Sequence, residues 1–137
     1  MSEPRTLSLL PWQVTLEEFN HGAGEVGPDG ACCAFVVDSS IPPAARGGYA
    51  SLVMAYSRAD EPVCVLDDGA ALVLVRDGGI ASGKALADRV FVQMRRLALH
   101  LTLTAGVAAI GDDPSQAVTA ARAAAASVPA GQVGTQA

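Results

Sequence analysis

An α+β fold is predicted by three features of this 137-residue sequence. Short apolar runs of strand length alternate with segments in which apolar residues recur at helical spacing. An Asp-Gly pair at 68–69 separates two of the apolar runs, which is a strong signal for a β-hairpin. Because 50% of the residues are hydrophobic and 17% are charged, we expect one domain with a buried core.

The amino-terminal thirty residues are expected to form an extension with one short helix. Thr15 and Glu18 have the spacing of a capping box, in which each side chain accepts from the other residue's amide. This spacing predicts a helix over residues 16–21. Glycine, proline and aspartate dominate residues 22–30 and predict a loop.

The next elements are predicted from apolar runs and from the residues that interrupt them. A continuous apolar run at 31–37 indicates a strand covered on both faces. The Pro-Pro pair at 42–43 argues against a helix at that point, and helical spacing predicts one over 48–57. Two short strands at 62–66 and 71–75 follow, joined by the Asp-Gly turn.

The second half of the chain predicts a helix, a strand and a further helix. An apolar stripe indicates an amphipathic helix over 85–98. Residues 101–110 alternate and then become wholly apolar, as in a core strand. The alanine-rich segment 115–127 favours a helix, and the chain from Pro129 onward is expected to be frayed.

The first six predicted domain elements follow the order βαββαβ. This is the split βαβ order of a ferredoxin-like fold, in which a four-stranded antiparallel sheet carries its helices on one face. The predicted fold is therefore this α+β arrangement with one additional carboxy-terminal helix.

Charge and hydropathy exclude several classes of function. Nine basic and 14 acidic residues give a net charge of -5, which disfavours binding to nucleic acid. No uncharged stretch reaches the roughly 18 apolar residues of a membrane span, and the start lacks the pattern of a secretory signal. We therefore expect a cytoplasmic protein without a membrane span.

The three cysteines are expected to be small buried hydrophobic residues in a reducing compartment. Cys32 and Cys33 are adjacent, and they and Cys64 lie in apolar runs. Since the two histidines are far apart in the sequence and no Cys-x-x-Cys pair is present, no zinc site is predicted.

The segment 57–75 resembles the centre of GGDEF domains, the family of the diguanylate cyclases. Arg58 and Glu61 occupy the ends of a tetrad that is Arg-x-x-Asp in the family. After five further residues, Asp-Asp-Gly-Ala-Ala at 67–71 stands in place of the family's Gly-Gly-Asp/Glu-Glu-Phe hairpin. Spacing farther downstream extends the resemblance to 31–133 and implies a nucleotidyl cyclase-like sheet. We assign residues 1–30 to the extension with its short helix, 31–133 to a degenerate GGDEF-like domain and 134–137 to a tail.

The hairpin differs from that of the family at the positions that the resemblance implies are catalytic. Acidic residues in the family's hairpin and on its first strand hold two metal ions, whereas Gly69 and Ala70 stand at the hairpin positions here. Ala71 replaces the phenylalanine, and Asp38 is the candidate left on the first strand. The segment after Asp38 also contains no asparagine with which to read guanine. The resemblance therefore implies a domain that is not an enzyme, with no catalytic residue, metal or cofactor.

Asp67 and Asp68 allow two interpretations. With Asp38 they could coordinate Mg²⁺, because carboxylate oxygens suit that hard cation. They could also serve as turn residues of a glycine-containing hairpin, which is the interpretation we prefer.

The resemblance also indicates a ligand site at Arg58, Glu61 and Arg89. These residues match the family's inhibitory site for its product, cyclic di-GMP, with glutamate in place of aspartate. Guanidinium groups bind phosphate in a bidentate manner, and a carboxylate can accept from the donor edge of guanine. Alternatively, Arg58 offsets a helix macrodipole and Arg89 pairs with Asp88 or Glu61.

Two functions follow from these observations. The chain is either a catalytically inactive GGDEF-like regulatory module that binds cyclic di-GMP, or a module for protein–protein interaction or assembly that binds no nucleotide. In the second case its partner is another protein or a second copy in a homodimer. A cyclase with unusual metal ligands is disfavoured by the missing carboxylates.

Overall fold

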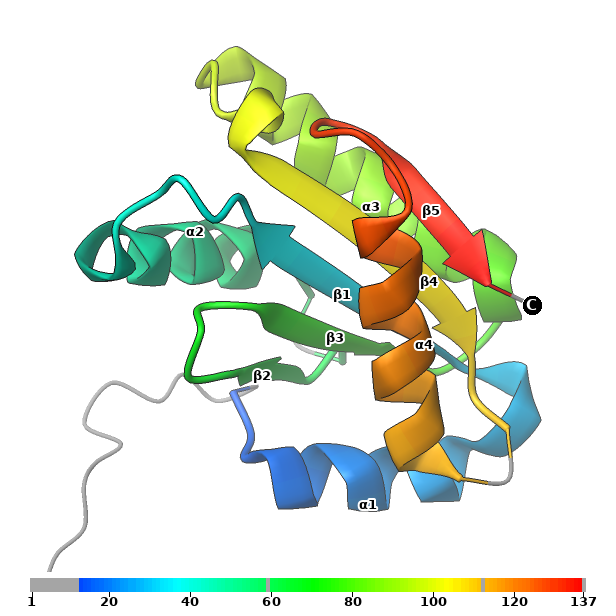
Figure 1. Cartoon of the computed structure of the whole chain (residues 1–137). Helices are drawn as coiled ribbons and strands as arrows, with labels where there is room; N and C mark the ends of the chain where they lie inside the picture. The colour runs from blue at the N-terminus through cyan, green and yellow to red at the C-terminus, as the bar shows by residue number, and fades with distance from the viewer. Residues whose placement is uncertain (1–12, 59, 112, 137) are drawn as a thin grey trace, which may run out of the picture.

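A five-stranded mixed sheet runs through the computed structural model, which describes residues 13–58, 60–111 and 113–136 (Figure 1). The strands lie in the order β2-β3-β1-β4-β5. Their bounds are β1 Ala31–Val37, β2 Val63–Val65, β3 Ala71–Val75, β4 Leu103–Ala109 and β5 Val133–Gln136. The helices are α1 Leu16–Val26, α2 Pro43–Tyr56, α3 Gly79–Arg96 and α4 Pro114–Ala126, with short 3-10 turns at Gly27–Asp29 and His100–Thr102.

The four predicted strands form the antiparallel part of the sheet. β1 is central and pairs antiparallel with both β3 and β4, and β2 pairs antiparallel with β3 through the predicted hairpin. The prediction of a wholly antiparallel, four-stranded sheet is wrong at one edge. There β5 pairs parallel with β4, with Val133 opposite Ala105, so the segment expected to fray is part of the sheet.

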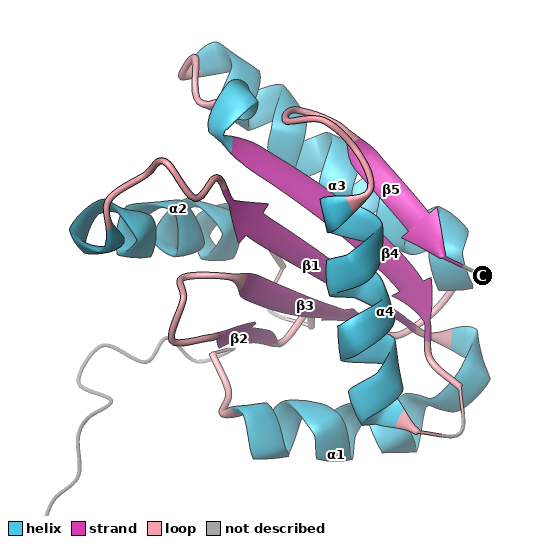
Figure 2. Cartoon of the chain, viewed as in Figure 1, coloured by secondary structure: helices cyan, strands magenta, loops and turns pink. Residues whose placement is uncertain are grey.

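Helices cover both faces of the sheet, so the prediction that they share one face is incomplete (Figure 2). Alternate side chains of β1 point to opposite faces. Cys33 and Phe35 lie in a core with residues of α2 and α3, as predicted. Cys32 and Ala34 lie in a second core with residues of α1 and α4. The fold therefore has three layers, with the sheet in the middle.

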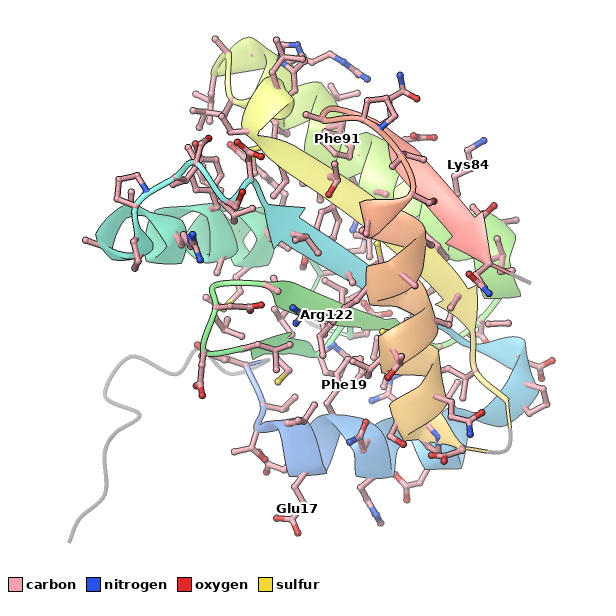
Figure 3. All side chains as sticks on the ribbon, viewed as in Figure 1. Glu17, Phe19, Lys84, Phe91 and Arg122 are labelled. Carbon is pink, nitrogen blue, oxygen red and sulfur yellow. The ribbon has the colours of Figure 1, made fainter. Side chains whose placement is uncertain are left out.

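The predicted capping box starts α1. The amide of Glu18 donates to the Thr15 hydroxyl, and the amide of Thr15 donates to the Glu18 carboxylate. The helix continues to Val26 through the residues expected to form a loop. Buried Phe19 and Ala23 share its inner face, and Figure 3 shows Phe19 pointing from α1 towards the sheet. Burial of this face compensates for the low helix propensity of the glycines.

The starts of α2 and α3 also differ from the predictions. α2 begins at Pro43 because proline fits the first helical position, where its missing amide hydrogen costs no hydrogen bond. α3 begins at Gly79, six residues before the predicted start at residue 85. Its extra turns contain Gly83, which is buried against β4 and lacks a side chain that would keep the helix away from the sheet.

α4 approaches the sheet at two glycines. A methyl group added at Gly106 of β4 would lie 1.9 Å from the carbonyl oxygen of Ala121, and one added at Gly134 of β5 would lie 2.2 Å from that of Ala124. Gly106 and Gly134 are directly opposite each other in the β4–β5 register. The helix backbone therefore rests on a strip of the sheet that has no side chains.

All three cysteines are buried, as predicted. Burial raises the pKa of the Cys32 thiol to about 12 and that of Cys64 to about 11, and it raises the pKa of Cys33 well above its usual value. These thiols are protonated at neutral pH and act as core side chains. Within the described residues, none of the helices combines the length and apolar character needed to cross a bilayer.

Candidate functional site

A pocket of about 320 Å³ lies where the turn after α2, the end of β3 and the first half of α3 meet. We call it the arginine pocket. Its charged lining residues are Arg58, Asp60, Glu61, Arg76, Asp77 and Arg89. The three residues predicted from the sequence are thus brought together from a loop and a helix.

Glu61 connects the two predicted arginines. Its Oε1 atom accepts a hydrogen bond from Nη2 of Arg89 at 2.6 Å and another from the backbone amide of Arg58 at 2.6 Å. The amide of Glu61 donates in return to the carbonyl of Arg58 at 2.9 Å, which closes a tight turn. The Glu61 side chain is only 12% exposed, so this ion pair is shielded from bulk water.

Arg89 also holds α3 against the end of α2. Its Nε atom donates to the carbonyl oxygen of Tyr56, the last residue of α2, at 3.2 Å. Helix carboxyl termini carry partial negative charge, so a guanidinium group is favoured there. Of the two acidic partners proposed for Arg89 in the alternative interpretation, Glu61 makes the ion pair.

The side chain of Arg58 differs from that of Arg89 in being exposed. Among the described residues it makes no ion pair within 4 Å. With respect to these described residues, its guanidinium group is therefore available in the lining of the pocket.

Arg76, Asp60 and Asp77 were not predicted as site residues. Arg76 directly follows β3, and its Nε atom donates to the carbonyl of Asp60 at 3.3 Å. Hairpin register could have found this pair. The register that sets Val63 opposite Val73, continued outward, sets Asp60 opposite Arg76.

The hairpin turn between β2 and β3 lies at the opposite end of these strands. The Asp68 carboxylate accepts from the Ala70 amide at 3.1 Å and from Nη2 of Arg122 on α4 at 2.5 Å. Arg122 reaches from α4 towards the hairpin (Figure 3). The hydrogen bond from Arg122 is the main reason that the pKa of Asp68 lies below its usual value. Asp68 thus has the turn role that we preferred.

Arg46 of α2 packs against this turn. A methyl group added at Gly69 would lie 2.6 Å from its Cβ atom. Its guanidinium group donates to the carbonyls of Ile41 at 2.9 Å and Ser39 at 3.2 Å. Asp38 accepts from the hydroxyl of Ser40, which lowers the pKa of its carboxyl, and the nearby charge of Arg46 lowers it further.

These residues lack acidic ligands that the family uses for its two metal ions. Gly69 and Ala70 have no carboxylate, and Arg46 places a positive charge near the remaining acid, Asp38. Across the described parts of the chain, no three His, Cys, Asp or Glu side chains are grouped closely enough to hold a metal ion.

Comparisons with known proteins identify the fold. No protein-family model matches the sequence, and no curated protein matches it. Among solved structures, the GGDEF domain of YfiN (TpbB) from Pseudomonas aeruginosa superposes with a TM-score of 0.70 at 16% identity, covering 93% of this chain and 99% of that one. The chain has the fold of a GGDEF domain.

Two other solved structures from the same organism have a similar fold. The diguanylate cyclase SiaD, solved in complex with its activator SiaC, gives a TM-score of 0.67 at 19% identity and covers 88% of this chain and 55% of that one. The GGDEF domain of FimX gives 0.62 at 14% identity, covering 89% and 93%. In this GGDEF fold the hairpin turn and the arginine pocket lie at opposite ends of β2 and β3.

Proposed function

We propose that this chain is a regulatory module with a GGDEF fold that binds cyclic di-GMP in the arginine pocket and has no cyclase activity. The observation that carries the proposal is that Arg58, Glu61 and Arg89 line one pocket.

The pocket offers suitable groups for a guanine nucleotide. The exposed guanidinium group of Arg58 can bind phosphate through two parallel hydrogen bonds, and its flat face can stack on a base. Both hydrogen bonds described for the Glu61 carboxylate use Oε1. Its Oε2 atom can therefore accept from the N1 and N2 donors of guanine, while Arg89 holds the carboxylate in place.

Binding is tested by isothermal titration calorimetry with cyclic di-GMP. We expect the wild type to bind with a micromolar or lower Kd, and Arg58→Ala to weaken binding by at least 2 kcal/mol, about 30-fold, because a charge-assisted contact is lost. Arg96→Ala is the matched control, since Arg96 is an exposed arginine outside the pocket. Absence of binding by the wild type, or equal losses in both variants, contradicts the proposal.

The lack of cyclase activity is tested with GTP and either Mg²⁺ or Mn²⁺. We expect no cyclic dinucleotide, because Gly69 and Ala70 stand at the hairpin positions whose carboxylates hold metal ions on the triphosphate in the family. Product formation above a protein-free blank refutes this part of the proposal.

A second candidate function, protein–protein interaction, is favoured by exposed leucines after α3. Leu97 is 48% exposed and Leu101 is 66% exposed, beside the arginines at 95–96. Contact between copies of the chain predicts concentration-dependent association in sedimentation velocity, which Leu101→Ser should weaken. Association with a protein activator, as in the SiaD–SiaC complex, is the corresponding expectation for a different partner.

A further inference from the structure

Arg76 is a third guanidinium group in the arginine pocket, and it is the one that the resemblance does not include. Its side chain is exposed. Its described hydrogen bond is a single one, from Nε to the carbonyl of Asp60 at 3.3 Å. A guanidinium group has five N–H donors, so the Nη atoms of Arg76 can bind a ligand while Nε holds the turn.

Arg76 enters the pocket from the end of β3, whereas Arg58 lies in the turn after α2 and Arg89 lies on α3. Arg58 and Arg89 are joined through Glu61 on the side of the pocket where α2 ends. Arg76 follows β3 and precedes α3, whose first-turn region lines the pocket through Ser82. The amino-terminal amides of a helix favour an anion, and α3 begins at Gly79, three residues after Arg76.

The acidic residues define what kind of anion the pocket accepts. Asp60 and Asp77 line it together with Glu61, so three carboxylates balance the three guanidinium groups. A pocket without net positive charge is a poor site for a simple anion such as inorganic phosphate. It suits a ligand that combines phosphates with hydrogen-bond donors, as guanine nucleotides do.

We propose that Arg76 forms a second phosphate subsite, so that the arginine pocket takes a ligand with two phosphate groups. This inference rests on the proposed binding of cyclic di-GMP and adds that different arginines contact the two phosphates. Arg58 and Arg89 contact one phosphate and its guanine, and Arg76, beside the start of α3, contacts the other phosphate.

Calorimetry with cyclic di-GMP tests the subsite on the full chain. Arg76→Ala is expected to weaken binding at least tenfold, and the surface control Arg96→Ala is expected to change it less than twofold. Arg76→Gln separates contact with the phosphate from positioning of the turn, because glutamine can still donate to the Asp60 carbonyl but carries no charge. We expect Arg76→Gln to lose as much affinity as Arg76→Ala. Thermal unfolding of the ligand-free variants should match that of the wild type.

Each result has a distinct meaning. If the wild type binds no cyclic di-GMP, the proposed function fails and the subsite fails with it. If the wild type binds and Arg76→Ala stays within twofold of it, the subsite alone is overturned. Wild-type affinity in Arg76→Gln with loss in Arg76→Ala also overturns the subsite, because Arg76 then only positions the turn. Heat of binding with inorganic phosphate equal to that with cyclic di-GMP overturns it as well.

Discussion

The two ends of the β2–β3 hairpin use arginine in different ways. At the turn, Arg46 donates to two backbone carbonyls and Arg122 pairs with Asp68. At the open end, Arg58 is exposed and Arg76 makes one long hydrogen bond to a carbonyl. The guanidinium groups at the turn are thus half-buried against the protein's own oxygens, whereas Arg58 and Arg76 at the open end are exposed to solvent and to a ligand.

This difference shows why an arginine in a cleft does not by itself indicate a binding site. Arg46 and Arg122 lie near the place where the resemblance puts catalysis, yet their contacts are those of structural residues. Arg89 is intermediate, because its ion pair with Glu61 stabilises the pocket and presents the carboxylate. Exposure distinguishes the two ends, because Arg58 and Arg76 are exposed whereas Arg46 and Arg122 are half-buried.

The largest effect on stability is expected at the open end, from Glu61→Ala. This change leaves the Arg89 guanidinium and the Arg58 amide without their shared acceptor, and we expect a loss of about 2–3 kcal/mol in the free energy of unfolding. Urea denaturation measures it. Asp60→Ala is the control, because that side chain is exposed and should cost less than about 0.5 kcal/mol. Equal losses would mean that Glu61 does not organise the pocket.

A smaller effect is expected at the turn, from Gly69→Ala. Gly69 has a φ of 88°, and an added methyl group would meet the Arg46 Cβ atom, so we expect a loss of about 1–2 kcal/mol. Gly79→Ala is the matched control, because Gly79 also has a positive φ, 58°, but open space around it. Thermal or urea unfolding should show the greater loss for Gly69→Ala. The opposite order would show that Arg46 does not fill the turn region.

The smallest effect is expected from Arg122→Ala, and it should depend on pH. Arg122 lowers the pKa of Asp68 from its usual 3.8, so the pair stabilises the fold above that pH and loses its effect as pH falls through the lowered pKa. For this half-exposed pair we expect about 0.2–1 kcal/mol at pH 7, shrinking towards zero below pH 3.8. Unfolding of both proteins across this range measures the difference. A difference in the free energy of unfolding that grows as the pH falls would contradict this prediction.

Local sequence signals predicted the hairpin, the central strands and the capping box that starts α1. The Asp-Gly turn is formed by residues 68–69, and the strand predicted at 71–75 has those bounds in the structure. β5 could not be predicted in this way. Its sequence, Val-Gly-Thr-Gln, has one apolar side chain, and its pairing with β4 depends on α4 placing it there.

The candidate site was predicted in part for a related reason. Arg58, Glu61 and Arg89 were found because a family pattern fixes their spacing in the sequence. Arg76 belongs to no such pattern, and its place in the pocket follows from the register of the hairpin. Arg46 was missed because the Pro-Pro pair at 42–43 argues against a helix, although the first turn of α2 begins at Pro43.

The contact of α4 with Gly106 and Gly134 limits how this sequence can drift during evolution. The inner face of α4 consists of Ala117, Ala121, Ala124 and Ala125. Backbone atoms of Ala121, Ala124 and Ala125 lie in the space that a side chain at either glycine would fill, so we expect larger side chains on this buried face to lift the helix off the two glycines. Neutral substitutions should therefore accumulate on the outer face of α4, while a mutation at either glycine would survive only with a compensating shift of the whole helix.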